Sequence, residues 1–381
     1  MISEKKIGLR KRLQLEVFRQ MRNINKKQHP IKQVFWECTL RCNLQCRHCG
    51  SDCKTATVLH EDMPAEDFLK ALDTITPNVN PSEVLVVITG GEPLVRKDIE
   101  DVGREVVKRG YMWGLVTNGW LLDEARLRSL LAAGMRSMTI SLDGLGENHD
   151  WMRGRQGSFA RTWNAIHLLC HTTGLMWDVD TCVNRRNIKS LDKMFHALEA
   201  EGVPRWRFLS IFPMGRAAKD PDMIITDEEF EQLMEFIKQR RNDYLAGKTS
   251  VRCYFGCEGF LGAYENEVRG HFFNCIAGIN VVSVLIDGSI SACSSIRSDY
   301  HQGNIYHDNL WEVWNTKFQV YRDHSWMAKK EPCSDCSFFR YCEGGGMHQR
   351  GDNDELIMCR MKRWSPPTPE LSEAVSLTVG K

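Results

Sequence analysis

Residues 34–49 read VFWECTLRCNLQCRHC, and this stretch decides how the rest of the chain is interpreted. Its first three residues form a short apolar run that is typical of a β-strand. Cys42, Cys46 and Cys49 then follow with the spacing C-x3-C-x2-C. Clusters used only for electron transfer take four thiolates. Three thiolates in one loop therefore predict an iron–sulfur cluster with one iron open to a further ligand.

A zinc knuckle is the alternative interpretation of these cysteines. Structural zinc sites usually pair two C-x2-C clips or add histidines, and they close with four ligands. The spacing in this loop does not fit that pattern. Cys38 and Cys53 flank the loop outside the spacing, and we expect both to be plain thiols that are buried or partly buried.

Composition places the chain among globular cytoplasmic proteins. Its 381 residues suffice for one large domain with a smaller appendage, and a net charge of +1 suggests neither a nucleic-acid nor a membrane partner. We find no apolar run of transmembrane length and no signal-peptide core. Thirteen of the fifteen cysteines fall within residues 38–53, 253–293 and 333–359. In a reducing compartment, this grouping indicates metal binding or redox chemistry.

Residues 1–30 are basic and are expected to form an N-terminal helix. Leu13, Val17, Phe18, Met21 and Ile24 recur at a helical spacing between lysines and arginines. We expect this apolar face to pack across the domain while the charges stay in solvent. A docking surface for an acidic leader peptide is the alternative.

From residue 31 to residue 250, strand-like and helix-like segments alternate. The expected strands are residues 34–36, 84–89, 112–117, 138–142, 179–183 and 206–211, and the expected helices are residues 65–75, 99–108, 124–132, 159–171 and 191–199. Such alternation predicts a parallel sheet with right-handed crossovers. Six units are too few for a closed eight-stranded barrel, so we predict an α/β fold with a partial (β/α)6 TIM-like barrel.

Polar residues and glycines follow these strands where each one ends. The second strand ends in Thr89-Gly90-Gly91-Glu92-Pro93, the third in Thr117-Asn118-Gly119, the fourth in Ser141-Leu142-Asp143-Gly144 and the fifth at Asn184, and the sixth leads into Pro213-Met214-Gly215-Arg216. Each run alone is only a turn signal. Working residues of barrels lie at the carboxyl ends of the strands, and paired glycines let backbone approach a ligand closely. The recurrence therefore predicts one site beside the cysteine loop.

Together, C-x3-C-x2-C, the GGEPL run of residues 90–94, TNG at residues 117–119 and SLDG at residues 141–144 resemble the radical S-adenosylmethionine (SAM) superfamily, over residues 32–216. The resemblance implies that Cys42, Cys46 and Cys49 hold a [4Fe–4S] cluster whose fourth iron binds SAM, which yields a 5′-deoxyadenosyl radical. It also implies a set of SAM-binding residues: Gly90, Gly91 and Glu92 at the amino group, Ser141 and Arg153 at the carboxylate, Asn184 at the ribose, His48 near the adenine, and Thr117, Asn118 and Asp143 around them. A solvated loop arginine is the alternative for Arg153.

After a charged helix over residues 227–244, the composition changes to cysteine, glycine and aromatic residues. Cys275, Gly288, Cys293, Cys333, Cys336, Cys342 and Cys359 follow in an order similar to that of SPASM domains, which bind one or two auxiliary [4Fe–4S] clusters. A structural zinc ribbon is the alternative. We therefore expect a SPASM domain over residues 251–365 and a C-terminal tail over residues 366–381.

One position departs from the SPASM pattern. The family usually has a cysteine four residues after the one matching Cys342, and here that residue is Gly346. The resemblance then assigns Cys333, Cys336, Cys342 and Cys359 to a complete outer cluster, and leaves Cys275 and Cys293 at an inner cluster. We expect Cys253 and Cys257 to complete the inner site. The alternatives are an inner iron open to substrate, with Cys253 and Cys257 as structural thiols.

The resemblance implies an oxidoreductase or maturase that modifies a peptide or protein at a side chain or backbone carbon, by oxidation, crosslinking or epimerisation. Expected partners are the peptide or protein and a reductant such as flavodoxin or ferredoxin. The loop around Cys38 is similar to that of enzymes found beside small lipoproteins. A heme or quinone cofactor enzyme shares every motif, whereas a non-catalytic iron–sulfur or zinc protein does not need GGEPL. Sulfatase maturases carry aspartate after the cysteine matching Cys293, and this chain has Ser294.

Overall fold

The structure is a computed structural model that describes residues 7–53, 61–256 and 258–361. The expected tail at residues 366–381 lies outside the described residues. The described strands form one ten-stranded sheet in the order β10-β9-β8-β1-β2-β3-β4-β5-β6-β7. Their bounds are β1 Gln33–Thr39, β2 Leu85–Gly90, β3 Met112–Thr117, β4 Met135–Ser141, β5 Met176–Val183, β6 Arg205–Ser210, β7 Arg252–Phe255, β8 Val281–Val284, β9 Ser289–Ser291 and β10 Gly303–Asn304.

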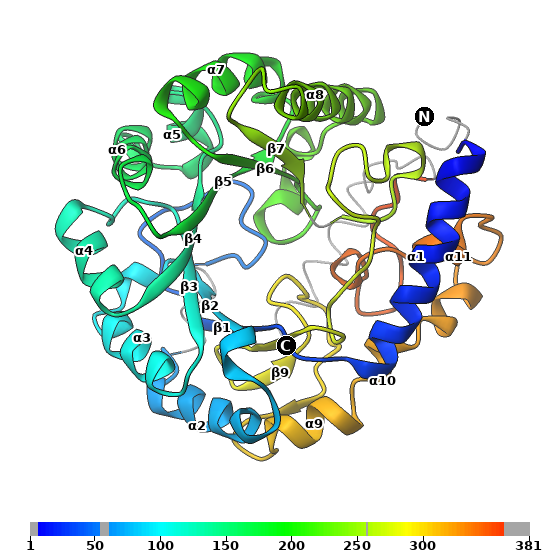
Figure 1. Ribbon diagram of the computed structural model, residues 1–381, viewed down its shortest axis with the longest axis horizontal. Helices are drawn as coiled ribbons and strands as arrows, with labels where there is room; N and C mark the ends of the chain where they lie inside the picture. Colours follow the sequence, from blue (N-terminus) through cyan, green and yellow to red (C-terminus); the bar gives the residue numbers. More distant parts are fainter. Residues whose placement is uncertain (1–6, 54–60, 257, 362–381) are drawn as a thin grey trace.

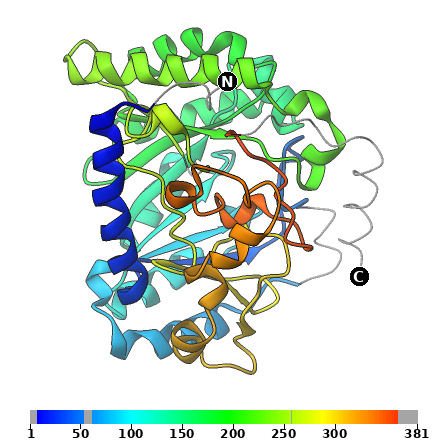
Figure 2. The ribbon, with the colours of Figure 1, turned by 90° about the vertical axis from the view of Figure 1, so that its right-hand side faces the viewer.

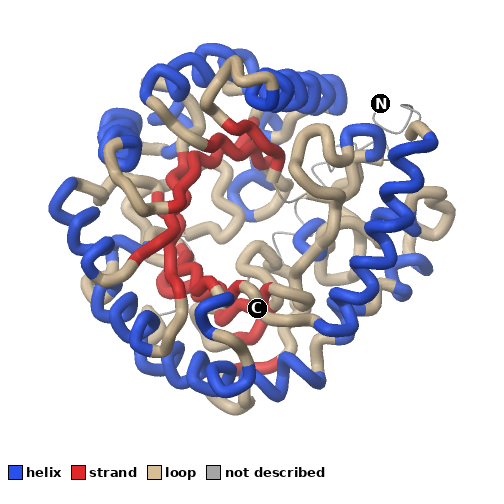
Figure 3. The backbone as a smooth tube through the Cα atoms, in the orientation of Figure 1, coloured by secondary structure: helices blue, strands red, loops and turns tan. Residues whose placement is uncertain are grey.

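The predicted partial barrel is confirmed. Neighbouring strands from β1 to β6 pair in parallel, and the strands form an open arc lined on its outside by helices (Figure 1, Figure 3). The helices are α1 Leu9–Gln28, α2 Ala65–Ile75, α3 Ile99–Lys108, α4 Glu124–Ala132, α5 Glu147–Arg153, α6 Ser158–Cys170, α7 Leu191–Glu201, α8 Asp227–Leu245, α9 Leu310–Thr316, α10 Gln319–Arg322 and α11 Phe339–Cys342. The bounds of α2, α3 and α4 are the predicted ones.

Large aromatic side chains fill the layer between the sheet and the helices. Trp36 of β1 stacks on Phe68 of α2 with ring centroids 4.6 Å apart. Trp206 of β6 packs edge-on against Phe236 of α8 at 6.2 Å. Loss of one such buried tryptophan typically costs about 3–5 kcal/mol. These contacts fix which face of each strand points outward to the helices, and the opposite face points into the barrel.

The cysteine-rich half of the chain adds strands to both sides of the predicted barrel. β7 pairs in parallel with β6, and β8 pairs in parallel with β1. β9 and β10 then continue the sheet with antiparallel pairing. β7 and β8 each have four residues, too few to show a clear period in the sequence. The two halves of the chain therefore share one sheet.

Helix α1 forms as predicted, but the expectation that its apolar face packs across the domain is wrong. Of the five predicted residues, Leu13, Val17, Met21 and Ile24 are exposed and Phe18 packs inward, against Phe272 at 5.5 Å; the inward face also contains the buried Leu15. The helix lies along one side of the molecule (Figure 2). Within the described ranges, no helix combines the length and the apolar character that crossing a membrane requires.

Candidate active site and auxiliary cluster sites

The cysteine loop, residues 40–53, follows β1, and the end of α5 holds its middle. The N–H of Gln45 donates to the carbonyl of Arg153 at 3.2 Å, and the N–H of Arg47 donates to the carbonyl of Met152 at 2.9 Å. These two bonds pair the loop with the last turn of α5. The loop therefore takes its shape from a helix about 100 residues further along the chain, as the barrel topology requires.

Arg216, in the turn after β6, holds the end of the same loop. Its Nε donates to the carbonyl of Cys46 at 2.6 Å, and its backbone N–H donates to the carbonyl of Cys49 at 3.1 Å. A terminal nitrogen donates to the Asp52 carboxylate and to the carbonyl of Cys53, both at 2.8 Å. The side chain thus satisfies two carbonyls that the irregular loop leaves without partners, and the backbone N–H satisfies a third.

Two glycines make these close approaches possible. Gly154 has φ +66°, and a Cβ there would lie 2.3 Å from the carbonyl oxygen of Gln45. Gly215 has φ +56°, and a Cβ there would lie 2.4 Å from the carbonyl oxygen of Cys49. Both the backbone conformation and the space exclude any other residue without local rearrangement.

The paired glycines Gly90 and Gly91 approach the loop itself. A Cβ at Gly90 would lie 2.1 Å from the oxygen of Thr39, and one at Gly91 would lie 2.3 Å from the oxygen of Arg41. The N–H of Gly91 donates to the Thr39 carbonyl at 2.7 Å. The pair therefore packs the end of β2 against the start of the cysteine loop. The sequence predicted a close approach of these glycines to a ligand, but it did not reveal this contact with the loop.

The structure brings the thiols of Cys42, Cys46 and Cys49 together, since each is close enough to act on the charge of another. Burial raises the pKa of Cys42 to about 12 and also raises the pKa of Cys46, which the neighbouring Arg153 opposes. A hydrogen bond from Cys53 lowers the pKa of Cys49 to about 6. Cys53 is therefore a neighbour of the loop thiols.

Glu92 is fully buried at the end of β2 and is held by three donors. Its Oε1 accepts from the hydroxyl of Thr117 at 2.8 Å and from the N–H of Leu94 at 3.1 Å, and its Oε2 accepts from the N–H of Asn118 at 2.8 Å. Burial raises the pKa of this carboxyl, and the bond from Asn118 opposes the shift. The arrangement fixes the carboxylate for a cationic ligand group.

Arg153 and Asp143 form a buried ion pair beside the loop. The guanidinium lies 2.8 Å from the Oδ2 of Asp143, and a second nitrogen lies 3.7 Å from the Sγ of Cys46. Arg153 is only 6% exposed, so the alternative of a solvated arginine is wrong. His48 Nε2 lies 3.7 Å from Asp143, and Cys182 brings its thiol to the same group. Burial lowers the pKa of His48, and the charges of Arg153 and Arg216 act in the same direction.

Asn184 is buried at the end of β5, where its side chain shapes the following turn. Its Oδ1 accepts from the N–H groups of Arg186 and Asn187 at 2.8 and 3.0 Å. Its Nδ2 faces the sulfur of Met152 at 3.5 Å. The oxygen is therefore committed to the turn, and the amide nitrogen is the group that remains for a ligand hydroxyl.

The barrel lumen contains an acidic cluster on β5 that the sequence analysis missed. Asp180 pairs in register with Arg207 of β6, whereas Trp206 points outward to α8. Since alternate residues of a strand share a face, Asp178 and Asp180 point inward. The sequence does contain a signal for this cluster, because carboxylates alternate with an apolar residue in Asp178-Val179-Asp180. The rest of the strand nevertheless has the composition of a strand that is buried on both faces.

Asp178 is saturated by its neighbours. Its Oδ1 accepts from the hydroxyl of Thr139 at 2.7 Å, and its Oδ2 lies 3.2 Å from Nε of Arg207 and accepts from the phenol of Tyr254. The phenol and the guanidinium therefore hold Asp178 as an ion pair. Both oxygens of Asp178 are therefore occupied, and Arg207 already has a carboxylate partner.

Asp180 differs from Asp178 because one of its oxygens is unsatisfied. The residue is 9% exposed and accepts a hydrogen bond from Ser141, but its Oδ1 has no hydrogen-bond partner among the described residues. Burial raises the pKa of this carboxyl to about 6, although Arg207 and Arg153 oppose the shift. A buried carboxylate oxygen without a partner is costly, so Asp180 is a candidate contact for a bound substrate.

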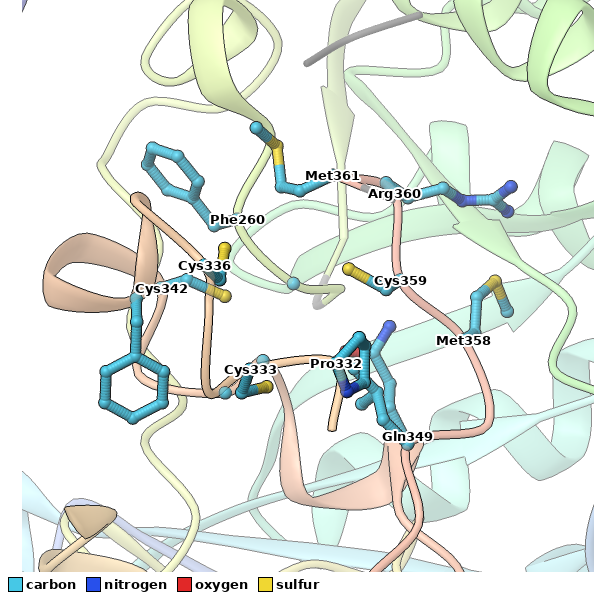
Figure 4. Close-up of a pocket in the computed structure, with 15 residues that line it drawn as sticks. Phe260, Pro332, Cys333, Cys336, Cys342, Gln349, Met358, Cys359, Arg360 and Met361 are labelled. Atoms are coloured by element: carbon cyan, nitrogen blue, oxygen red, sulfur yellow. The ribbon is translucent and has the colours of Figure 1, made fainter. Parts of the chain in front are cut away.

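The four outer cysteines line one pocket (Figure 4). Cys333, Cys336 and Cys359 each act on the thiol of Cys342, whose pKa burial raises to about 12. A nitrogen of the fully buried Arg350 lies 3.5 Å from the Sγ of Cys333. Four thiols with an adjacent cation form a complete ligand set for an anionic cluster.

The inner pair, Cys275 and Cys293, is also brought together, and burial raises the pKa of both thiols. Cys253 does not join them. On β7 it is in register with Trp206, which packs against Phe236 of α8, so the thiol faces the outer helices. Cys257 lies outside the described residues.

The ring of His348 fills the space that a side chain at position 346 would occupy. A Cβ on Gly346 would lie 2.5 Å from Cε1 of the His348 ring, which packs on Phe212 with centroids 4.6 Å apart. Burial lowers the pKa of His348 to about 4, and its Nε2 has no partner among the described residues. A cysteine at 346 would therefore require the ring to move.

Comparison with known proteins decides the family. A family model described as the radical SAM superfamily matches residues 36–198. The chain therefore contains a radical SAM domain. A second model, the SPASM iron–sulfur cluster-binding domain, matches residues 275–337. The radical SAM and SPASM assignments made from the sequence are thereby confirmed.

Relatives of this radical SAM protein include enzymes with different substrates. It is 26% identical over 339 residues to the AdoMet-dependent heme synthase of Oleidesulfovibrio alaskensis, covering 84% of this chain and 82% of the relative. It is 29% identical over 324 residues to the mycofactocin maturase MftC of Mycolicibacterium smegmatis, covering 82% and 77%. Streptococcus suis SuiB bound to its precursor peptide SuiA has a TM-score of 0.68 at 16% identity, covering 90% and 79%. The last similarity concerns the fold.

The residues of both sites fit the cofactors of this family. Radical SAM enzymes use a [4Fe–4S] cluster with SAM, and SPASM domains bind auxiliary iron–sulfur clusters. Cys42, Cys46 and Cys49 supply three thiolates, and Arg153 and Asn118 direct donors at Cys46 and Cys42, which suits an anionic cluster. Residues around the loop would hold SAM beside such a cluster, and the two groups together, with one electron from a reductant, would supply the radical chemistry that removes a hydrogen atom from a substrate. The chain's own residues must bind SAM and shield the radical.

Proposed function

We propose that this radical SAM enzyme modifies a peptide or protein at a side chain or backbone carbon, by oxidation, crosslinking or epimerisation. A one-electron reductant such as flavodoxin or ferredoxin would serve the loop cluster, and the auxiliary sites would exchange electrons with the substrate or orient it. We propose Glu92, fixed by Thr117 and Asn118, as the contact of the SAM ammonium. Gly90, Gly91, Ser141, Asp143, Arg153 and Asn184 complete the proposed SAM site.

The charges in the barrel lumen are our reason for choosing a peptide substrate over a porphyrin. Arg153 pairs with Asp143, and Arg207 pairs with Asp178. Each arginine thus already has a carboxylate partner, whereas Asp180 presents an oxygen without a hydrogen-bond partner among the described residues. Like charges in a low-dielectric site repel strongly. The lumen thus suits a neutral or cationic peptide group better than a porphyrin with several carboxylates.

The second candidate is a heme-type reaction, which the sequence similarity to heme synthases supports. The names of other relatives support the peptide class, among them a PqqA peptide cyclase and the mycofactocin maturase. Formylglycine formation is the third candidate, and Ser294 in place of an aspartate speaks against it. The lumen charge distinguishes the first two candidates because a porphyrin substrate brings several carboxylates, whereas a peptide segment can be neutral or cationic.

Release of 5′-deoxyadenosine tests this proposal. Anaerobically reconstituted and reduced enzyme is incubated with SAM and either pools of synthetic peptides or iron coproporphyrin III, and the additions are analysed by mass spectrometry. We expect a peptide pool to raise 5′-deoxyadenosine release and to contain a product of altered mass. An Asp180→Asn variant should keep the substrate-free release and lose the increase with peptide. Turnover of the porphyrin alone would overturn the proposal.

A further inference from the structure

Helix α1 exposes most of its apolar residues to solvent, whereas Leu15 is buried and Phe18 packs on Phe272 on the inward face, beside polar contacts to the protein. Leu9, Leu13, Val17, Met21 and Ile24 form one line along the helix, called here the apolar stripe, with side chains exposed by 76, 61, 63, 61 and 56%. Their positions recur every three or four residues, so they share one face. At 1.5 Å per residue the stripe is about 22 Å long.

The opposite face of α1 is fixed to the protein by polar contacts. Arg22 donates to the carbonyl of Tyr341 at 2.6 Å and lies 3.0 Å from the Glu343 carboxylate. Lys11 binds Glu267 at 2.8 Å near the other end. Contacts at both ends hold the helix in this orientation, so the outward position of the stripe is a property of the fold.

The charges around the stripe have one sign. Arg10, Arg12 and Lys27 are exposed beside it. The only acidic residue of α1, Glu16, is bound by Arg340 at 2.6 Å and by the phenol of Tyr341 at 2.7 Å. The outward face of the helix therefore combines aliphatic side chains with cations, and the acidic Glu16, four residues after Arg12, is already paired with Arg19 and Arg340.

We propose that the apolar stripe of α1 docks this enzyme onto the surface of an anionic membrane. A helix with aliphatic residues on one face and basic residues beside them can lie in the interface between headgroups and acyl chains. Leu13, Val17 and Met21 would enter the acyl boundary, and Arg10, Arg12 and Lys27 would bind lipid phosphates. The helix lies on the surface and does not span the membrane.

The charges and shape of the stripe favour a membrane over two other occupants. A second copy of the chain would bring the cations of two stripes together without acidic partners, and like charges repel. A peptide usually binds in a groove or along an open sheet edge, whereas the stripe runs along a helix at the side of the molecule (Figure 2). An anionic bilayer matches both the flat apolar line and the cations.

Vesicle sedimentation with the full-length, anaerobically reconstituted chain tests this proposal. We expect binding to vesicles of phosphatidylcholine mixed with phosphatidylglycerol, and weaker binding to phosphatidylcholine alone. Leu13→Gln/Val17→Gln/Met21→Gln should lower binding to the mixed vesicles by about tenfold or more. Arg10→Gln/Arg12→Gln/Lys27→Gln should lower it by about tenfold or more on anionic vesicles only.

Met112→Gln/Met176→Gln is the matched control, because these exposed methionines lie at the starts of β3 and β5. It should bind vesicles like the unchanged chain, and all variants should keep their iron content and their 5′-deoxyadenosine release. The proposal is overturned if the unchanged chain binds neither vesicle. It is also overturned if the stripe variants abolish a dimer seen by light scattering, or if the stripe binds an acidic amphipathic peptide while vesicles do not bind.

Discussion

The cysteine loop and the outer auxiliary site both gather thiolates, but they do so by different means. The loop takes its shape from α5 and from Arg216, elements that lie more than 100 residues away along the chain. The outer site draws on residues 333–359, with Arg350 of the same segment beside Cys333. The loop cluster therefore depends on the barrel fold, whereas the outer site is largely local. Changes in the barrel should remove one cluster and spare the other.

Removal of the three loop thiols should give the largest effect. The variant Cys42→Ala/Cys46→Ala/Cys49→Ala should abolish SAM cleavage and keep the auxiliary clusters, because thiolates of the second domain cannot replace ligands in the loop. The measurement is 5′-deoxyadenosine release together with iron content. Residual release from the reduced, reconstituted variant would show that the catalytic cluster has been assigned to the wrong cysteines.

Gly215→Ala should remove the loop cluster without touching a ligand. The added Cβ would lie 2.4 Å from the Cys49 carbonyl oxygen, and the residue has a positive φ. Gly157→Ala is the matched control, since Gly157 also has a positive φ (+79°) but no atom within 4 Å of its added Cβ. We expect Gly215→Ala to lose the loop-cluster absorbance and SAM cleavage, and Gly157→Ala to keep both. Equal behaviour of the two variants would contradict the role of close packing.

Replacement of Cys253 and replacement of Cys275 should differ in their effect on the inner cluster site. Because Cys253 faces the helices outside the barrel, Cys253→Ala should leave iron content and cluster spectra unchanged. Cys275→Ala should lower the iron content if an inner cluster is present, since Cys275 lies beside Cys293. Iron and sulfide analysis with electron paramagnetic resonance measures both. Iron loss in the Cys253 variant would restore the original ligand assignment.

The sequence predicted the barrel and its glycine-rich strand ends well, because periodicity was strong where helices bury one face against a sheet. The same signal failed at α1. Its spacing reveals an apolar face but does not show which face points to the protein. Arg22 and Lys11 help to set that orientation, and their partners lie more than 200 residues away along the chain. The prediction missed Asp180 because it treated residues 179–183 as a short apolar strand, although the carboxylates at positions 178 and 180 alternate with Val179. The sequence also could not show that Gly90 meets Thr39.

Glu92→Gln should weaken SAM binding and keep the loop cluster. A charge-assisted hydrogen bond contributes roughly 1.5–3 kcal/mol, so affinity should fall by about tenfold or more. The Gln side chain can keep its bond from Thr117, but its amide nitrogen can face the N–H of Asn118, so cluster absorbance and melting temperature must be checked. Isothermal titration with SAM gives the dissociation constant. An unchanged constant would exclude Glu92 as a SAM contact.

Asp180 should give the smallest effect, a pH-dependent stability. Its folded-state pKa of about 6 lies above the ordinary value of 3.8, so the folded state keeps a proton that the unfolded state releases. The stability that this proton contributes is present below pH 3.8 and is lost as the pH rises through 6, by about 3 kcal/mol at most. Asp180→Asn cannot release a proton, and it should therefore melt higher than the unchanged chain at roughly pH 7, with a smaller difference at roughly pH 5. Asp101→Asn on the exposed side of α3 is the control, and a difference for Asp180→Asn that is equal at both pH values would show that the carboxyl does not titrate in this range.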